Sequence, residues 1–303
     1  MVKNGVDMIC EYCGCDHIQK RGIRNGLQRV VCKDCGKWSQ VVPITNVSKV
    51  LLFDIETTPM EVYVWSLIGN KYIQPNNIIQ DWNVLSWSAK WLYDSEVISD
   101  VQTPQEAIER DDERIIKSLW HLIDEADILI AHNGDRFDIK KINTRFHLNG
   151  LLPPSPYQSI DTLKAVKRSF AFSSNKLDYL GQLLTNKGKI STNFKLWTDC
   201  LLGKRQALNE MLAYNEEDVR LLEEVYLELR AWIKSHPNLG MGGVGELCPT
   251  CGSDDIRYNG GYYTTAANRY LSYRCGDCGS LSRRLESELS VEDRRALMRS
   301  LPR

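Results

Sequence analysis

Residues 50–59, VLLFDIETTP, decide the fold class of the central part of the chain, because an apolar run of strand length ends in two acidic residues. Side chains two positions apart in a strand share a face, so Asp54 and Glu56 are expected to project together from one side of this run. An unpaired charge is costly to bury. The pair therefore indicates either a solvated strand end or a site where a divalent cation compensates the charge.

The composition is that of a globular protein, with 43% hydrophobic and 25% charged residues in a chain of 303. This length predicts one sizeable core with small satellite domains. No apolar stretch approaches the roughly 18 residues that a membrane span needs. The first ten residues, MVKNGVDMIC, lack the pattern of a signal peptide. We therefore expect a cytoplasmic protein with no membrane partner.

Charge is distributed unevenly around a net value of −1. Residues 1–47 hold seven Lys and Arg against four Asp and Glu, and residues 246–303 hold nine against eight. The remaining centre holds 22 basic against 27 acidic residues. An acidic centre between more basic ends suits a carboxylate-rich site that needs cations, with ends that contact polyanions.

Eight of the ten cysteines form four Cys-x-x-Cys pairs near the two ends of the chain. The pairs are Cys10 with Cys13, Cys32 with Cys35, Cys248 with Cys251, and Cys275 with Cys278. Such spacing is typical of metal sites in a reducing compartment rather than of disulfides. Each set of four predicts one structural Zn²⁺, which makes two for the chain, and leaves Cys15 and Cys200 as free thiols.

The two cysteine-rich ends resemble each other, because CEYCGCDHI at 10–18 and CPTCGSDDI at 248–256 share the pattern C-x-x-C-G-x-D-x-I. A repeated zinc ribbon is the simplest account. The glycine after the second cysteine of a pair allows a tight turn that points amide N–H groups at the sulfurs. We expect a zinc ribbon at 1–46, a core domain at 47–236, a flexible glycine-rich linker at 237–245, and a second zinc ribbon with a tail at 246–303.

Basic and aromatic residues within the ribbons indicate binding of nucleic acid. The candidates are Arg21, Arg24, Arg29 and Trp38 in the first ribbon and Arg269, Tyr270 and Arg274 in the second. Arginines contact phosphates, and aromatic rings stack on bases. The alternative is that the ribbons only mediate contacts with proteins.

Between the ribbons, strand-like and helix-like stretches alternate, which is typical of an α/β fold. We expect strands at 50–55, 84–91, 96–102 and 127–131, and helices at 105–124, 137–149, 176–185 and 205–234. Asp218 falls on the apolar face of the last predicted helix, with Tyr214 one turn earlier on the same face. A buried carboxylate requires a partner, which here is either Tyr214 or a bound cation.

A third acidic position follows the apolar strand predicted at 127–131. In the stretch HNGDRFD at 132–138, Asp138 falls in the first turn of the next helix and faces the strand ends, where open α/β sheets place their ligands. Asp135 is a competing candidate, and an Asp in this position can equally cap the helix.

Taken together, three motifs resemble the DEDD 3′→5′ exonucleases of the ribonuclease H-like superfamily in both order and spacing. The motifs are DIET at 54–57, Asn133-x-x-x-Phe137-Asp138, and Tyr214-x-x-x-Asp218. The resemblance is to the tyrosine-type subgroup, since Ala213 stands where the histidine-type subgroup has its histidine. It covers roughly residues 48–235. It implies a ribonuclease H-like core with a mixed central sheet and helices on both faces, flanked by the two zinc ribbons.

The resemblance also implies hydrolysis with two Mg²⁺ or Mn²⁺ ions, hard cations that oxygen ligands favour. Asp54, Glu56 and Asp218 would hold one ion with its nucleophilic water. Asp54 would share a second ion, which Asp138 would support through water. Tyr214 would orient the attacking water.

The implied substrate is single-stranded nucleic acid, with DNA favoured over RNA, cut from its 3′ end to release nucleoside 5′-monophosphates. Any polymerase, or other replication or repair partner, would be a separate chain. Two alternatives use the same residues. One is a catalytically silent, nuclease-like adaptor that binds nucleic acid, and the other is a structure-selective endonuclease or ribonuclease.

Overall fold

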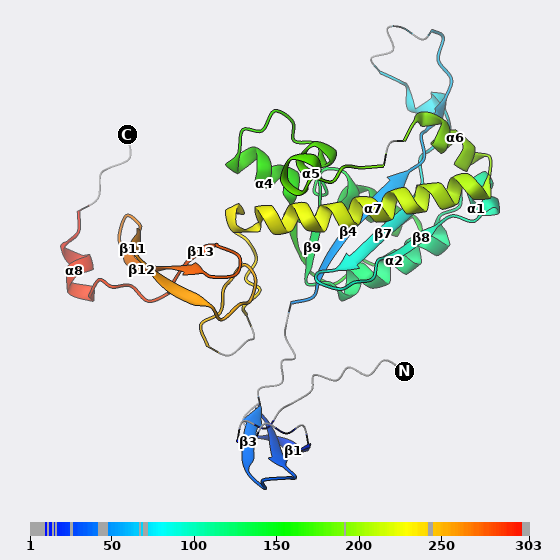
Figure 1. Ribbon diagram of the computed structural model, residues 1–303. Coiled ribbons are helices and arrows are strands. Elements are labelled where there is room, and N and C mark those ends of the chain that lie inside the picture. Colours follow the sequence, from blue (N-terminus) through cyan, green and yellow to red (C-terminus); the bar gives the residue numbers. More distant parts are fainter. Residues whose placement is uncertain are drawn as a thin grey trace.

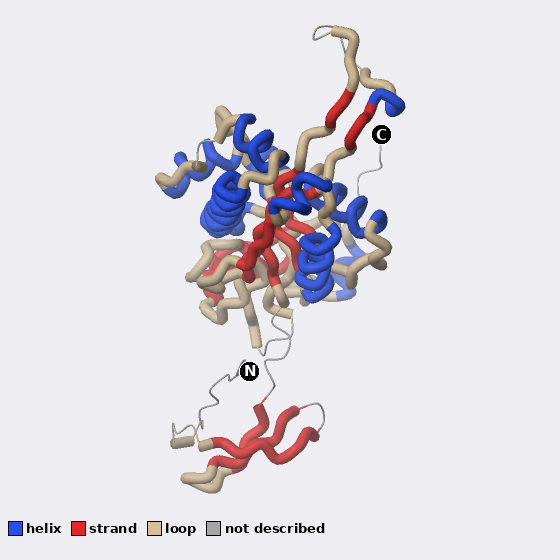
Figure 2. The backbone as a smooth tube through the Cα atoms, turned by 90° about the vertical axis from the view of Figure 1, so that its right-hand side faces the viewer, coloured by secondary structure: helices blue, strands red, loops and turns tan. Residues whose placement is uncertain are grey.

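The computed structural model confirms the predicted fold class, a mixed central sheet with helices on both faces (Figures 1 and 2). The described residues are 10, 12–13, 15, 17–24, 27–41, 48–66, 68, 72–190, 192–241 and 245–298. Within the first ribbon, the side chains at 18, 20–24, 27–30 and 39–41 lie outside this description.

Five strands form the central sheet in the order β10-β9-β4-β7-β8. They are β4 (Val50–Thr57), β7 (Val84–Trp91), β8 (Ile98–Val101), β9 (Ile128–Ala131) and β10 (Gln158–Asp161). β4 pairs antiparallel with β7 and parallel with β9, so it joins the two halves of the sheet. The four predicted strands are confirmed, and β10 adds a parallel edge strand that we did not predict. A separate two-stranded antiparallel sheet, formed by β5 (Glu61–Val62) and β6 (Ile78–Gln80), follows β4 in the chain.

The helices confirm most of the predicted segments. They are α1 (Pro104–Glu109), α2 (Glu113–Glu125), α3 (Asp138–Leu148), α4 (Thr162–Ser169), α5 (Leu177–Thr185), α6 (Phe194–Leu201), α7 (Arg205–Leu229) and α8 (Val291–Ala296). The sequence analysis did not predict α4 and α6. Among the described residues, none of the helices combines the length and the apolar character required to cross a bilayer.

The single helix predicted at 105–124 is wrong, because the chain breaks it into α1 and α2. α1 begins with a capping box between Thr103 and Glu106 and ends at Arg110, which adopts the left-handed conformation with φ 58°. The predicted helix at 205–234 also ends early, since α7 stops at Leu229 and one 3-10 turn follows.

The side chains of β4 alternate between two different environments, one on each face of the sheet. Leu51 and Phe53 pack into the cluster that α2 and α3 cover, whereas Leu52 packs into the cluster beneath α4, α5 and α7. Asp54 and Glu56 continue the series of Leu52. The strand period therefore directs both carboxylates to the face of the sheet that α7 crosses (Figure 1).

The ribbon sheets share one topology, with three antiparallel strands in chain order. The first contains β1 (Ile18–Arg24), β2 (Leu27–Cys32) and β3 (Trp38–Val41), and the second contains β11 (Ile256–Thr264), β12 (Arg269–Cys275) and β13 (Leu281–Arg283). The isoleucine of the shared motif lies opposite an equivalent cysteine in both, Ile18 opposite Cys32 and Ile256 opposite Cys275. This shared register supports an internal repeat.

The last residue of the predicted core domain and the described start of the predicted linker are anchored by specific contacts, which we did not expect of a flexible segment. His236 Nε2 lies 2.9 Å from the Tyr226 hydroxyl of α7. Leu239 packs against the cluster beneath α7, and its N–H donates to the Pro249 carbonyl at 2.8 Å. Residues 242–244 of the predicted linker lie outside the described residues.

A buried ion pair joins the start of α2 to α3. The Asp112 side chain is fully buried, and Arg145 Nη2 donates to its Oδ1 at 2.6 Å. The Val84 N–H donates to the other carboxylate oxygen at 2.9 Å.

Replacing Arg145 with alanine leaves the Asp112 carboxylate buried without its cation. We expect Arg145→Ala to lower the free energy of unfolding of the core by about 3–5 kcal/mol. The control is Lys117→Ala, which removes an exposed pair with Glu113 and is expected to cost less than about 0.5 kcal/mol. Urea denaturation followed by tryptophan fluorescence measures both, and equal losses would contradict the assignment.

Candidate active site

Three carboxylates from distant parts of the chain converge on the α7 face of the sheet. Asp54 and Glu56 from β4 and Asp218 from α7 each offer an oxygen atom, and these atoms all lie within 4.8 Å of one another. β4 supplies two of them through its period of two, and α7 lies across the strand with the apolar stripe that carries Asp218 turned inward. We call these three residues the carboxylate cluster.

Small polar residues of β7 leave room for this cluster, because Ser88 lies opposite Asp54 and Ser86 opposite Glu56. Asn215 Nδ2 of α7 donates to Asp54 Oδ2 at 2.8 Å, and the Ser86 hydroxyl donates to Asn215 Oδ1 at 3.3 Å. This chain of hydrogen bonds orients the Asp54 carboxylate. The sequence analysis missed Asn215, although its place three residues before Asp218 on a helix is a usable signal.

Asp138 approaches β4 from the start of α3. Its side chain is 2% exposed, and its Oδ1 accepts a hydrogen bond from the Ile55 N–H at 3.3 Å. β9 pairs with β4 only as far as Leu52, so this N–H lies beyond the ladder and Asp138 satisfies it. Asp138 is not one of the three residues within 4.8 Å of one another, but its charge raises the pKa of Asp54.

The turn between β9 and α3 places Asp138 rather than Asp135 at the site. Asn133 adopts φ 70°, which asparagine tolerates, and a Cβ on Gly134 would lie 2.5 Å from the Ala131 Cβ. Asp135 instead forms an ion pair with the exposed Lys164, at 2.7 Å, and lies outside the carboxylate cluster. Both acidic residues lie outside the three-residue cluster, but Asp138 contacts β4 next to Asp54, which favours Asp138 as the candidate.

Burial and mutual repulsion raise the pKa values of these carboxyl groups. Burial is the largest cause for Asp54, whose pKa lies well above its usual range, and the other three carboxylates add to it. Burial, followed by the charge of Asp218, raises the pKa of Glu56 to about 8. Burial raises the pKa of Asp138 to about 7. Near neutral pH, these carboxyl groups therefore lose their protons less readily than they would in water.

Lys189 lies in the loop between α5 and α6. Among the described residues, it is a cation whose positive charge lowers the pKa values of all four carboxyl groups. Its ammonium donates to Asp218 Oδ2 and lies 5.6 Å from the centre of the Tyr214 ring. Burial opposes the charge of Lys189, but Asp218 outweighs it and holds the pKa of Lys189 above its usual range. The sequence analysis missed Lys189, because no motif marks it.

One orphaned atom tests whether the site fits a divalent cation. Asp218 is 1% exposed, and its Oδ1 has no hydrogen-bond partner among the described residues. A buried carboxylate oxygen without a partner is unfavourable unless a ligand satisfies it. With an all-oxygen cluster around it, this atom fits a hard divalent cation such as Mg²⁺ or Mn²⁺.

Tyr214 lies one turn before Asp218 on α7, with its ring 6.4 Å from that of Trp197 in an edge-to-face arrangement. Burial, followed by the charge of Asp218, raises the pKa of the Tyr214 hydroxyl to about 12. The hydroxyl therefore stays protonated at neutral pH and can hydrogen-bond to a water molecule at the cluster.

Two neighbouring polar residues have structural partners. His132 has Nδ1 2.9 Å from Thr162 Oγ1 and Nε2 2.9 Å from the Asn175 carbonyl, so both ring nitrogens are engaged. Asp161 caps α4 and accepts a hydrogen bond from the Leu163 N–H at 3.0 Å. Neither residue belongs to the carboxylate cluster.

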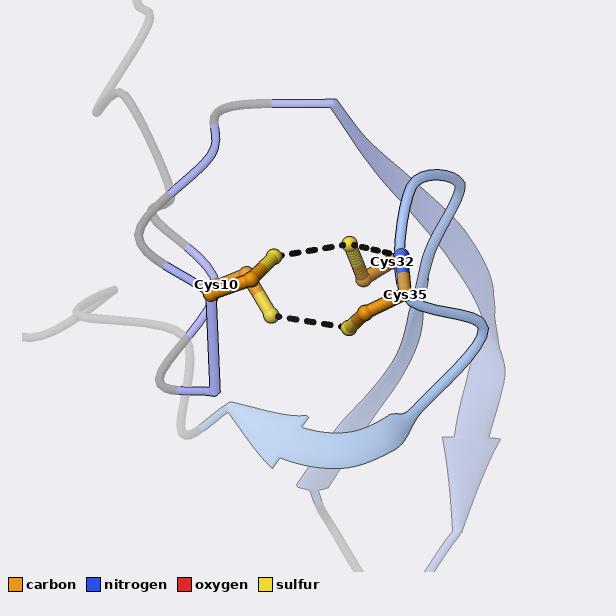
Figure 3. Close-up of side chains that lie close together, drawn as sticks. Cys10, Cys32 and Cys35 are labelled. Carbon is orange, nitrogen blue, oxygen red and sulfur yellow. Dashed lines mark hydrogen bonds between the residues drawn. The ribbon is translucent and has the colours of Figure 1, made fainter.

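The two cysteine sets form compact clusters, each with four sulfurs within 4.8 Å of one another. The Cys10–Cys35, Cys13–Cys32, Cys248–Cys278 and Cys251–Cys275 sulfurs are each 3.6 Å apart. Figure 3 shows the first cluster, with Cys10 facing Cys32 and Cys35. A disulfide would need about 2.05 Å. Tetrahedral zinc, with Zn–S bonds of about 2.3 Å, would hold the sulfurs about 3.8 Å apart. Both clusters therefore fit zinc.

Turns at the cysteine pairs have the predicted glycine geometry. Gly36 and Gly279 adopt φ 67° and 74°, in the left-handed region that favours glycine. The Cys35 N–H donates to Cys32 Sγ at 3.4 Å and lowers the pKa of that thiol to about 6, toward the thiolate form that binds zinc. Cys15, predicted to be a free thiol, lies beside this cluster with its sulfur 3.2 Å from that of Cys32.

The predicted nucleic-acid contacts lie on the ribbon sheets. Alternation along β12 places Tyr270 and Arg274 on one face and Arg269 on the other. Trp38 begins β3 and is exposed. The side chains of Arg21, Arg24 and Arg29 lie outside the described side chains.

The raised pKa values predict how a divalent cation stabilises the core. A carboxyl whose pKa rises on folding stabilises the fold at low pH and loses that contribution as pH rises through the folded value, about 7 for Asp138 and about 8 for Glu56. Without divalent cations, we expect the melting temperature of wild type, relative to Glu56→Gln, to fall between pH 6 and 8.5. Added Mn²⁺ should raise it more at pH 8.5, because protons compete at pH 6.

Differential scanning fluorimetry of the zinc-loaded protein in resin-treated buffer measures this effect. Each 1 kcal/mol of stabilisation corresponds to roughly 2–4 °C in a domain of this size. A Mn²⁺ shift of equal size at both pH values would contradict the assignment of the site.

The segment that carries the carboxylate cluster also matches a known family. No curated protein matches the chain. A family model described as the RNase_H superfamily matches residues 51–230, a segment that begins in β4, ends just after α7 and includes every residue of the carboxylate cluster. The match covers more than half of the 303 residues. The chain belongs to the RNase H superfamily, the nucleases and related proteins built on this mixed sheet.

Proposed function

We propose that the protein is a metal-dependent 3′→5′ exonuclease of the tyrosine-type DEDD class, acting on single-stranded nucleic acid. The observation that carries this proposal is the convergence of Asp54, Glu56 and Asp218 within 4.8 Å, with Tyr214 one helical turn from Asp218. Membership of the RNase H superfamily supports a nuclease. The order and spacing of the three motifs support the exonuclease class.

The carboxylate cluster would hold one divalent cation, and Asp54 would share a second that Asp138 supports through water. Mg²⁺ or Mn²⁺ in these positions supplies Lewis acidity that neutralises the phosphate and the charge on the attacking and leaving oxygens. Asn215 keeps the Asp54 carboxylate in place through its 2.8 Å hydrogen bond. The orphaned Asp218 Oδ1 gains its missing partner in the same arrangement.

Tyr214 and Lys189 have complementary roles in this proposal. The Tyr214 hydroxyl, protonated at neutral pH, orients the water whose oxygen attacks the terminal phosphorus. The bond from this phosphorus to the 3′ oxygen of the preceding nucleotide then breaks, and a nucleoside 5′-monophosphate leaves. The attacking water loses its proton to solvent, and the freed 3′ oxygen takes a proton from solvent. Lys189 balances the charge of Asp218 before cations bind and supplies a positive charge beside the phosphate afterwards.

The ribbons complete the proposal as two zinc-stabilised modules that hold the nucleic acid. Segments this small cannot build a core of their own, so the four thiolates and their metal stabilise each fold.

Substitution at the carboxylate cluster tests the function directly. On a 5′-labelled single strand with Mn²⁺, the wild type should produce a ladder that shortens from the 3′ end, and on a 3′-labelled strand it should release a labelled mononucleotide at once. We expect Asp54→Ala and Asp218→Ala to lower the rate by about 10³-fold or more. Tyr214→Phe should lower kcat by about 100-fold with little change in KM.

The matched control is Asp135→Ala, an acidic residue of the same turn that lies outside the cluster, and its rate should stay within about twofold of wild type. Internal cuts that leave a 3′ end intact would favour an endonuclease. No cleavage of DNA or RNA with either cation would favour a silent adaptor. Either result overturns the proposal.

A further inference from the structure

The second ribbon presents one solvent-facing side of its sheet that its own fold does not use. Cross-strand partners share a face, and the register pairs Tyr263 with Tyr270, Ser272 with Arg283, and Arg257 with Arg274. Positions 270, 272 and 274 alternate onto one side of β12, so all these residues lie together. We call this side the outer face.

Side chains on the opposite side of the same sheet mainly contact other parts of the second ribbon. It carries Ile256 opposite Cys275, a member of the second cysteine cluster, and Tyr258 opposite the buried Tyr273. Arg284 lies 5.2 Å from the Tyr273 ring and pairs with Glu246 at 2.6 Å. Most of the inner side therefore holds the ribbon together, although it also carries Tyr262 with the Arg269 guanidinium 4.7 Å from its ring centre. The outer face is left for another role.

Aromatic and guanidinium groups on the outer face are already stacked. The Arg283 guanidinium lies 3.9 Å from the Tyr270 ring centre and 5.5 Å from the Tyr263 ring centre. The two tyrosine rings are 6.4 Å apart and inclined by 35°. Tyr263 is 53% exposed. Cation–π contact holds the arginine plane in place without covering the second ring.

Charge on the outer face favours a polyanion. Arg257 is neutralised by Asp255 at 2.7 Å, but within the described part of the chain no ion pair engages Arg274 or Arg283. Arg274 donates to the Gly279 carbonyl and Arg283 to the Arg284 carbonyl, contacts that position each side chain and leave its charge uncompensated. Leu281 lies opposite Arg274 on the same face and is 56% exposed, but the uncompensated arginines around it favour a polyanion over a protein surface, because the core of a protein interface is depleted of charge.

We propose that the outer face of the second ribbon is a stacking platform for single-stranded nucleic acid. Bases stack on the Tyr263 ring and on the guanidinium plane of Arg283, while Arg274 contacts backbone phosphates. The inference rests on the proposed function for the class of ligand. It goes beyond that function by placing Tyr263 and Arg283 in the contact, beside Tyr270 and Arg274, and by leaving Arg269 on the opposite side.

Neighbouring tyrosines provide a matched test. Tyr263 and Tyr262 are 53% and 50% exposed and lie on opposite sides of β11, since Tyr262 pairs with Leu271. In full-length Asp54→Ala protein, which should not degrade the probe, fluorescence anisotropy with a labelled 15-nucleotide poly(dT) strand measures binding. We expect Tyr263→Ala to weaken affinity about tenfold and Tyr262→Ala to change it less than about twofold.

Arg283→Ala gives a second, independent readout. It should weaken binding with little change in the slope of log K against log salt, as expected for a lost base-stacking group, whereas Arg274→Ala, which removes a phosphate contact, should reduce that slope by about 1. Zinc content of two ions per chain, measured for every variant, shows that the ribbons remain folded. The platform is overturned if Tyr263→Ala and Arg283→Ala bind as tightly as their parent, or if Tyr262→Ala weakens binding as much as Tyr263→Ala.

Failure of the platform and failure of the nuclease are distinguishable in these experiments. If only the platform is lost, we expect Tyr263→Ala to cleave a dinucleotide at the wild-type rate, because both nucleotides of this substrate flank the bond that is cut at the carboxylate cluster. Conversely, Tyr263-dependent binding in a protein whose wild type cuts no substrate would retain the platform and reject the exonuclease.

Discussion

Buried negative charge is the constraint on which the rest of this structure depends. Asp54, Glu56, Asp138 and Asp218 meet at one end of β4, and Lys189 is the described cation that acts on all four. Folding alone cannot make such an arrangement favourable, because burial and repulsion both raise the pKa values of the carboxyl groups. The α7 helix, the serines of β7 and the Asn133–Gly134 turn all serve to bring this charge together. Carboxyl groups whose burial is unfavourable without a ligand indicate a ligand-binding site.

The ribbons solve a related problem with different chemistry. Their short sheets bury little apolar surface, and each carries a four-sulfur cluster that fits zinc, which would take the place of a core. Soft thiolates and hard carboxylates select different ions, which keeps the structural metal apart from the cations proposed for the core. Because Cys275 of the second sulfur cluster faces the inner side of that ribbon, the Tyr263, Tyr270 and Arg283 side is free to contact a ligand.

Much of this arrangement could be predicted from periodicity alone. The period of two in β4 and the helical stripe of α7 placed Asp54, Glu56 and Asp218 correctly, and cysteine spacing predicted both sulfur clusters. Lys189 could not be predicted, since a loop residue has no periodic pattern and its partner is distant in sequence. The break between α1 and α2 was missed although the charged run ERDDER at 109–114 interrupts the apolar spacing there, and the left-handed backbone of Arg110 ends the first helix. Whether Asp135 or Asp138 reaches the site depended on a turn geometry that sequence does not specify.

The central claim is that the carboxylate cluster exists to bind divalent cations. Anomalous diffraction from crystals soaked in Mn²⁺ tests it most directly, because each bound ion gives its own signal. The account predicts a peak bonded to oxygens of Asp54, Glu56 and Asp218, with the ammonium of Lys189 displaced from Asp218. A cluster that binds no manganese at millimolar concentration and pH 8, with the contact between Lys189 and Asp218 intact, would contradict it.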